Sequence, residues 1–112
     1  MSHLQLVLHH GEHGADFDAA TPADYQQLAD EFWANPRPVH VFECARSKGD
    51  TLRFDTMTDA FSVLGSNMVI RTFYKPVPCS SLPASLAIPM RMSGDCHGES
   101  SNLAYFQREC RK

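Results

Sequence analysis

The feature that most constrains the fold is a change in the spacing of apolar residues at Asn35-Pro36-Arg37-Pro38. After these prolines, apolar and polar residues alternate, which is typical of β-strands. Four such runs follow, at residues 39–46, 51–55, 60–64 and 68–74, with only a few turn residues between them. Links this short join antiparallel neighbours, so the sequence predicts a four-stranded antiparallel meander.

A helix is predicted immediately before this sheet. Thr21 suits the N-cap position, Pro22 suits the first helical position, and the prolines that follow Asn35 end the helix. The apolar residues recur at helical spacing and form one face: Tyr25, Leu28, Ala29, Phe32 and Trp33. We expect this face to pack in the core. Further upstream, residues 4–10 fit either a short helix or a first strand.

The chain after the sheet lacks a clear period. Residues 76–101 are rich in Ser, Pro and Gly, which predicts an irregular loop with a short strand around 86–90. The segment 102–106 carries two aromatic residues, which we expect to pack back onto the sheet. The sequence therefore predicts one α+β domain over 1–112, with a helical part at 1–36, an antiparallel sheet at 39–75 and a loop-rich tail at 76–112. N-terminal helices would pack on one face of the twisted sheet and leave the other face open.

Composition and charge exclude several classes of protein. The 112 residues are 43% hydrophobic and 21% charged, which fits a globular domain and not a disordered chain. No apolar run approaches the length that a membrane span needs, and the N-terminus does not resemble a signal peptide. Residues 1–36 carry six acidic and no basic groups, whereas residues 37–112 carry ten basic and seven acidic groups. This asymmetry predicts an acidic side and a mildly basic side that can bind a few phosphates.

Four cysteines in a short chain allow three disulfide pairings in an oxidising compartment. They are Cys44, Cys79, Cys96 and Cys110. Because no secretion signal is visible, we expect reduced thiols, as in cytosolic proteins. The spacings do not match the paired ligands of structural zinc sites, although His97 directly follows Cys96.

Three of the six histidines, His9, His10 and His13, lie within five positions. If this stretch is helical, His9 and His13 are one turn apart on one face. That arrangement suits a catalytic pair, a metal-binding pair or an exposed helix end, and the residues alone leave all three open.

The last predicted strand carries a second group of polar residues. Strict alternation divides its residues between two faces, with Val69, Arg71, Phe73 and Lys75 on one and Ile70, Thr72 and Tyr74 on the other. Arg53, on a neighbouring strand, could add a cation to either face. By themselves, such arginines are most simply solvated or paired with surface acids.

The order of short motifs adds a resemblance. The motifs are His13-Gly14-Ala15-Asp16-Phe17, the capped helix, residues 49–55, Phe61-Ser62-Val63 and residues 69–76. In this order they resemble the C-terminal ribonuclease domains of bacterial polymorphic and contact-dependent inhibition toxins. Colicin D is such a toxin, and its nuclease belongs to the fold group of barnase-like, EndoU, colicin-type and RelE-type ribonucleases. The resemblance covers approximately residues 4–76.

The resemblance implies an activity and a set of residues for it. It implies a metal-free endoribonuclease without a cofactor, which cleaves RNA, with tRNA as the expected substrate, through attack of a 2′-hydroxyl to leave a 2′,3′-cyclic phosphate. The implied catalytic residues are His13, with His9 or His10 as its partner, and Arg71, Thr72 and Tyr74. Lys75 and Arg53 would bind the substrate.

The same resemblance implies a cognate immunity protein as partner, delivery as part of a larger toxin, and action in the bacterial cytoplasm. Two other interpretations of the sequence stay open. One is a protein-binding module or an inactive relative of the toxin fold. The other is a metal site built from His9, His13 and a distant ligand such as His97 or Cys96.

Overall fold

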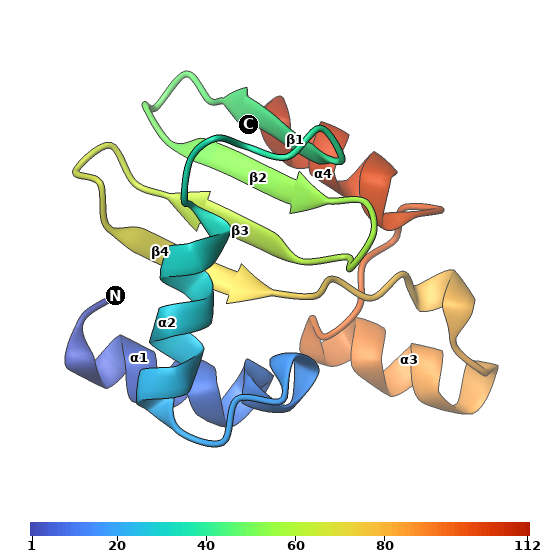
Figure 1. Cartoon of the computed structure of the whole chain (residues 1–112). Helices are drawn as coiled ribbons and strands as arrows, with labels where there is room; N and C mark the ends of the chain where they lie inside the picture. The colour runs from blue at the N-terminus through green and yellow to red at the C-terminus, as the bar shows by residue number, and fades with distance from the viewer.

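A computed structural model describes the whole chain, residues 1–112, as an α+β domain (Figure 1). Its elements, in chain order, are helix α1 (His3–His13), the 3-10 turn η1 (Gly14–Phe17), helix α2 (Pro22–Phe32), strands β1 (Val41–Ala45), β2 (Thr51–Asp55), β3 (Phe61–Leu64) and β4 (Ile70–Tyr74), the 3-10 turn η2 (Cys79–Ser81), and helices α3 (Ala84–Ser93) and α4 (Asn102–Cys110). None of the helices is long and apolar enough to span a membrane.

The sheet is the predicted antiparallel meander, with strand order β1-β2-β3-β4. Strict alternation along β4 is wrong, however. Val63 pairs with Thr72 and Leu64 pairs with Ile70, which leaves Arg71 as an extra residue in a bulge. A bulge moves the residues beyond it to the other face. Ile70 therefore lies in the same core cluster as Phe73.

The predicted helix over the first face of the sheet is confirmed as α2. The Thr21 side chain accepts a hydrogen bond from the Asp24 N–H at 3.1 Å, and Pro22 occupies the first turn. Tyr25 is fully buried, and its hydroxyl donates to the backbone carbonyl of Phe73 on β4. Trp33 caps the helix and donates from Nε1 to Ser62 Oγ at 2.8 Å. These contacts fix α2 on the sheet.

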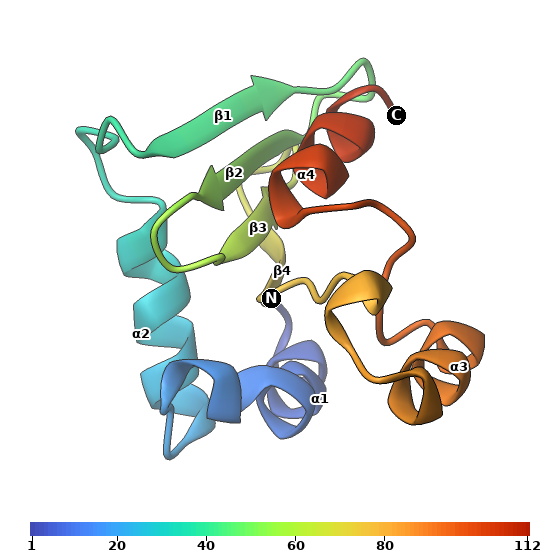
Figure 2. The same cartoon turned by 90° about the vertical axis from the view of Figure 1, so that its right-hand side faces the viewer.

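The second face of the sheet is covered, so the expectation of an open face is wrong. Helix α4 lies on the side opposite α2 (Figure 2). Its Phe106 is buried and lies 5.9 Å from Phe54 between ring centroids. The predicted packing of the aromatic segment 102–106 onto the sheet is thus confirmed. This segment is the start of a nine-residue helix, which is long enough to cover that face.

The tail before α4 also differs from its prediction. Residues 84–93 form α3, and no strand occurs around 86–90. Ala, Leu and Met are strong helix formers, and Gly94 ends the helix with a φ of 81°. The only strand-like pairing in the tail is a single bridge between Pro78 and His97.

Two disulfides connect the tail to itself and to the sheet, so the expectation of reduced thiols is wrong. Cys44 on β1 pairs with Cys110 on α4, and Cys79 pairs with Cys96. No cysteine is left free. The pairing of Cys44 with Cys110 could not be predicted, because it depends on the packing of α4 on the sheet.

Candidate active site

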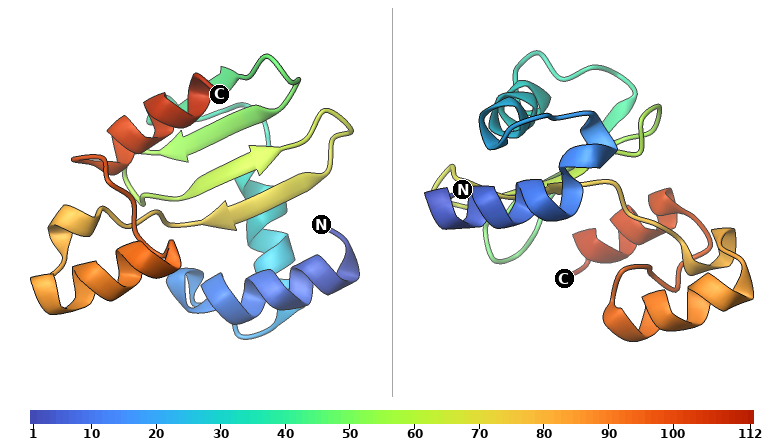
Figure 3. Two further views of the ribbon diagram at one scale, coloured as in Figure 1. Left: turned by 180° about the vertical axis from the view of Figure 1, so that it is seen from behind. Right: turned by 90° about the horizontal axis from the view of Figure 1, so that it is seen from below.

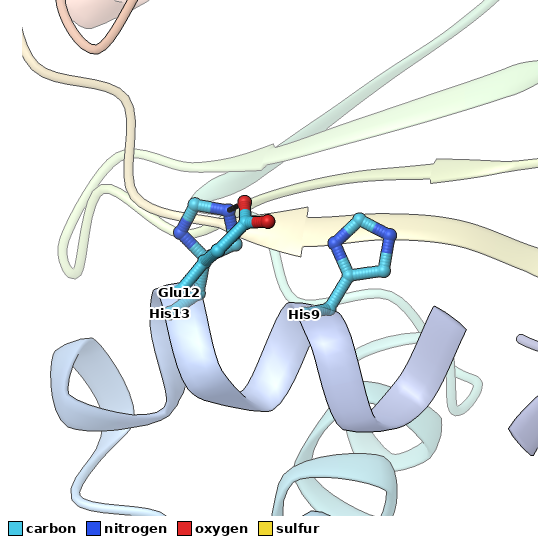
Figure 4. A group of neighbouring side chains, drawn as sticks. All are labelled: His9, Glu12 and His13. Carbon is cyan, nitrogen blue, oxygen red and sulfur yellow. Dashed lines mark ion pairs between the residues drawn. The ribbon is translucent and has the colours of Figure 1, made fainter. Parts of the chain in front are cut away.

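The N-terminal histidines lie on α1, which resolves the choice between helix and strand for residues 4–10. Ser2 and Gln5 form a capping box that starts the helix. Helical spacing puts His9 and His13 on one face, and both side chains point from α1 toward β4 (Figure 4). His10 lies elsewhere, because its Nε2 is 2.8 Å from the carbonyl oxygen of Ala19. The structure therefore brings His9 and His13 together and does not bring His10 to them.

His13 is the best-positioned titratable group of the pair. Its ring stacks on Tyr74 with centroids 5.3 Å apart, and its side chain is 26% exposed. Glu12 Oε2 lies 3.5 Å from Nε2, and Asp16 Oδ2 lies 3.8 Å from Nδ1. Burial lowers the pKa of His13, and the two carboxylates oppose this effect only in part. A neutral imidazole that can accept a proton therefore faces the solvent beside Tyr74.

An open groove of about 970 Å³ begins at His13. Residues of α1 and of the end of β4 form one wall, and residues of the tail form the other. Figure 3 shows the chain that leaves β4 and runs from it into the tail. The aromatic and cationic residues that line it are His13, Tyr74, Lys75, His97, Tyr105 and Arg108. Glu12, Asp16 and Asp95 are its acidic lining residues. The groove thus combines two imidazoles, two cations and two phenols.

No residue of the tail wall of this groove was predicted as a catalytic or substrate-binding residue. His97 stacks on Tyr105 at 4.4 Å, and its Nε2 lies 2.8 Å from Asn102 Oδ1. Its Nδ1 accepts a hydrogen bond from the Glu99 N–H, so both ring nitrogens have partners. The guanidinium of Arg108 lies 5.0 Å from the Tyr105 ring. The neighbouring Cys96 is the one sequence signal at this wall, since its disulfide holds His97 beside the exit of β4.

Arg53 does not join the groove. It is 4% exposed and donates to the Glu43 carboxylate at 2.7 Å and to the carbonyl oxygen of Phe32. It also lies over the Trp33 ring at 4.9 Å. These contacts occupy the guanidinium in joining α2 to the sheet, so we assign Arg53 to the fold and not to substrate binding.

Arg71 and Thr72 lie beside a second, smaller hollow of about 510 Å³. The Arg71 side chain is 62% exposed and pairs with the buried Asp50 at 3.3 Å. Thr72 Oγ1 is buried and has no hydrogen-bond partner. Of the predicted site residues on β4 and just after it, only Tyr74 and Lys75 line the same groove as His13.

One group of side chains can hold a metal ion. His9, Glu12 and His13 each offer a ligand atom, and these atoms lie within 4.8 Å of one another (Figure 4). The distant ligands that the sequence analysis considered are engaged elsewhere. Cys96 is in a disulfide, and both ring nitrogens of His97 have partners. Glu12 is the third ligand that the sequence analysis did not identify.

Comparisons with known proteins do not assign this chain to a family. No protein-family model matches the chain, and no curated protein matches it. The resemblance to toxin ribonucleases therefore depends on the short motifs alone, and a function must be argued from the groove.

Proposed function

We propose that this protein is a toxin-like endoribonuclease that cleaves RNA in the groove without needing a metal ion. The observation that carries the proposal is the stacking of His13 on Tyr74 in a groove that also contains Lys75 and Arg108. Cleavage of RNA through its own 2′-hydroxyl requires a proton acceptor, a proton donor and cations near the phosphate. The groove offers the acceptor and the cations, and His9, beside His13 on α1, offers the donor.

His13 takes the proton in this mechanism. As the 2′-hydroxyl loses its proton to His13, its oxygen attacks the adjacent phosphorus and the bond from phosphorus to the 5′-oxygen breaks. The carboxylates of Glu12 and Asp16, at 3.5 and 3.8 Å, stabilise the imidazolium that forms. The products are a 2′,3′-cyclic phosphate and a 5′-hydroxyl.

His9 is the second proton-transfer group. Its ring centroid lies 6.2 Å from that of His13 on the same face of α1, so both imidazoles could reach one phosphate placed beside the pair. A protonated His9 would donate to the departing 5′-oxygen, and the proton on His13 would return through solvent. His10 has no part in this step, because the Ala19 carbonyl occupies its Nε2.

Lys75 and Arg108 supply positive charge to the phosphate. They lie on opposite walls of the groove, one directly after β4 and one on α4. Lys75 acts as a point charge. Arg108 pairs with Glu99 at 3.3 Å and with Glu109 at 3.6 Å, so it would turn from these carboxylates to the phosphate when RNA binds. The aromatic lining suits unpaired bases, so the favoured substrate is a single-stranded part of an RNA, such as a loop of tRNA.

The proposal also specifies a partner and a route. A cell that makes such an enzyme needs an immunity protein, and acidic groups on that protein would complement Lys75 and Arg108. Disulfides persist in secreted proteins, which agrees with delivery to another cell.

The test is cleavage of total tRNA by the purified protein with both disulfides formed, read on a denaturing gel. We expect discrete fragments with cyclic phosphate ends, in the presence of a chelator as well. The variant His13→Ala should cleave on the order of a hundredfold more slowly or worse. The matched control is His40→Ala, since His40 is a part-exposed histidine before β1, at the opposite edge of the sheet from β4.

Two outcomes would contradict the proposal. The first is intact RNA with a folded wild-type protein, which would favour a binding module or an inactive relative. The second is equal cleavage by wild type and by His13→Ala, which would remove His13 from the site. Circular dichroism and a count of free thiols confirm that each variant is folded and oxidised.

A further inference from the structure

We infer that His9, Glu12 and His13 form a binding site for a zinc-like divalent transition metal ion on the face of α1 that points toward β4. The three side chains come from one helix and point the same way (Figure 4). The site would give the ion two imidazole nitrogens and one carboxylate oxygen. This is the ligand set that zinc accepts with one position left for water.

The geometry needs only small adjustments to close on an ion. Zinc bonds of about 2.0 to 2.2 Å hold neighbouring ligand atoms roughly 3.5 Å apart. Here the atoms lie within 4.8 Å of one another, and Glu12 Oε2 is already 3.5 Å from His13 Nε2. The Glu12 side chain is 65% exposed, so it can rotate without disturbing the core. Helix α1 thus already holds the ligands on one side of a space of the right size.

His9 provides an independent observation. Its Nδ1 is shielded from solvent and has no hydrogen-bond partner. Buried polar atoms without a partner are rare in proteins, and an unplaced ion is one of their recognised explanations. The ring of His9 is therefore held beside the other two ligands with an unsatisfied nitrogen.

The rest of the chain offers little competition for the ion. All four cysteines are in disulfides, so no thiolate is available. His10 and His97 are hydrogen-bonded within the fold. Two nitrogen ligands also favour zinc, nickel or copper over magnesium, which prefers oxygen ligands and water.

The consequence for activity rests on the proposed function. A metal ion on His13 and His9 would occupy the nitrogens that transfer protons, so the ion would inhibit RNA cleavage instead of supporting it. Removal of the ion by a chelator would restore activity.

The test measures metal binding without RNA, on protein that carries no polyhistidine tag and has both disulfides formed. Zinc chloride should bind with a stoichiometry of one in calorimetry. At a concentration of about one hundred times Kd, it should raise the melting temperature by on the order of 10 °C. Magnesium chloride at the same concentration should leave the melting temperature unchanged.

Ligand variants locate the site. His9→Ala, Glu12→Gln and His13→Ala should each weaken zinc binding by about a hundredfold or more. Such a loss is larger than the roughly tenfold to hundredfold loss seen when only a hydrogen-bond partner of a metal ligand is removed. The matched control is His3→Ala, which removes a histidine from the same helix outside the cluster and should bind like wild type.

Two results would overturn the inference. One is no zinc-dependent shift in the wild-type protein, and the other is a shift of equal size in Glu12→Gln, which would mean non-specific binding to histidines. Neither result involves RNA, so the ribonuclease proposal can fail while the metal site stands, and the reverse. Inhibition of RNA cleavage by the bound ion is tested by the ratio of the cleavage rate with zinc to the rate without zinc. This ratio should fall well below one in wild type and stay closer to one in Glu12→Gln.

Discussion

The phenol oxygens of Tyr74 and Tyr105 lie 2.5 Å apart, so one hydrogen bond joins the last strand to the last helix. Both rings line the groove, and Tyr74 also carries the stacked ring of His13. Burial raises the pKa of both phenols, which keeps them protonated. The pair thereby connects the two walls of the groove.

A double-mutant cycle on this pair should show strong coupling. Tyr74→Phe or Tyr105→Phe leaves one part-buried hydroxyl without its partner and should lower the free energy of unfolding by about 1 kcal/mol. The double variant removes both hydroxyls and should cost about as much as either single variant. Urea unfolding followed by circular dichroism measures all four proteins. Additive losses would mean that the two hydroxyls do not interact.

The two arginines that the resemblance placed in the site should behave differently on truncation. Arg53 is buried and bonded to Glu43 and to backbone carbonyls, so Arg53→Ala should lower the free energy of unfolding by about 3 kcal/mol. Arg71 is mostly exposed, and its partner Asp50 keeps a second contact with Arg46, so Arg71→Ala should cost less than about 0.5 kcal/mol. Thermal and urea unfolding compare the two. An Arg53→Ala protein that is as stable as wild type but no longer cleaves RNA would show that Arg53 acts in substrate binding and not in stabilising the fold.

Much of the fold could be predicted from the sequence because its signals are local. The caps at Thr21 and Pro22 and the helical spacing before Asn35 define α2, and the alternating runs define the four strands. The bulge at Arg71 could not be predicted, because nothing in the alternation of residues 68–75 shows that one residue lacks a pairing partner. One unpaired residue is enough to move Ile70 to the other face.

The candidate site was only half visible in the sequence for a related reason. His13, Tyr74 and Lys75 lie on elements with clear local patterns. His97, Tyr105 and Arg108 lie on the tail, whose position depends on the pairing of Cys44 with Cys110 and on contacts with the sheet. Four cysteines allow three pairings, and sequence alone cannot choose among them.

Two glycines near the end of α1 should respond oppositely to alanine. A Cβ at Gly11 would meet no atom within 4 Å, so Gly11→Ala should stabilise the exposed helix by about 1 kcal/mol. A Cβ at Gly14 would lie 2.6 Å from the His10 ring and 3.3 Å from the Ala19 carbonyl oxygen. Gly14→Ala should therefore displace His10 and cost about 1 to 3 kcal/mol. Melting temperatures of the two variants give the comparison, and a stabilised Gly14→Ala protein would contradict this packing.

The stability of the protein should fall in alkaline solution, partly through Tyr25. Burial, with Asp16 and Glu12 nearby, raises the pKa of Tyr25 well above its ordinary value of about 10. Above that value the unfolded chain releases this proton and the folded protein keeps it. The free energy of unfolding therefore falls by about 1.4 kcal/mol per pH unit for this group.

The variant Tyr25→Phe isolates that contribution. It loses the hydrogen bond to Phe73 and should be less stable than wild type by about 1 kcal/mol near neutral pH. Tyr74 and Tyr105 are present in both proteins and contribute equally to both. The difference in free energy of unfolding between wild type and Tyr25→Phe should therefore shrink as the pH rises from about 9 to about 11. Urea unfolding over this range measures it. Parallel pH profiles would show that Tyr25 ionises as easily in the folded state as in the unfolded one.

The two disulfides should contribute differently to stability and to the groove. Cys44 and Cys110 are 66 residues apart, and Cys79 and Cys96 are 17 apart, so chain entropy predicts losses of about 4 and about 3 kcal/mol when each pair is replaced by serine. Cys96 directly precedes His97, so loss of its disulfide with Cys79 should also let His97 and the rest of the tail wall move away from the groove. At a temperature where both variants are folded, we expect the Cys79 and Cys96 variant to lose more RNA cleavage than the Cys44 and Cys110 variant, although its predicted loss of stability is smaller. A Cys79 and Cys96 variant with full cleavage would show that the tail wall does not depend on the disulfide.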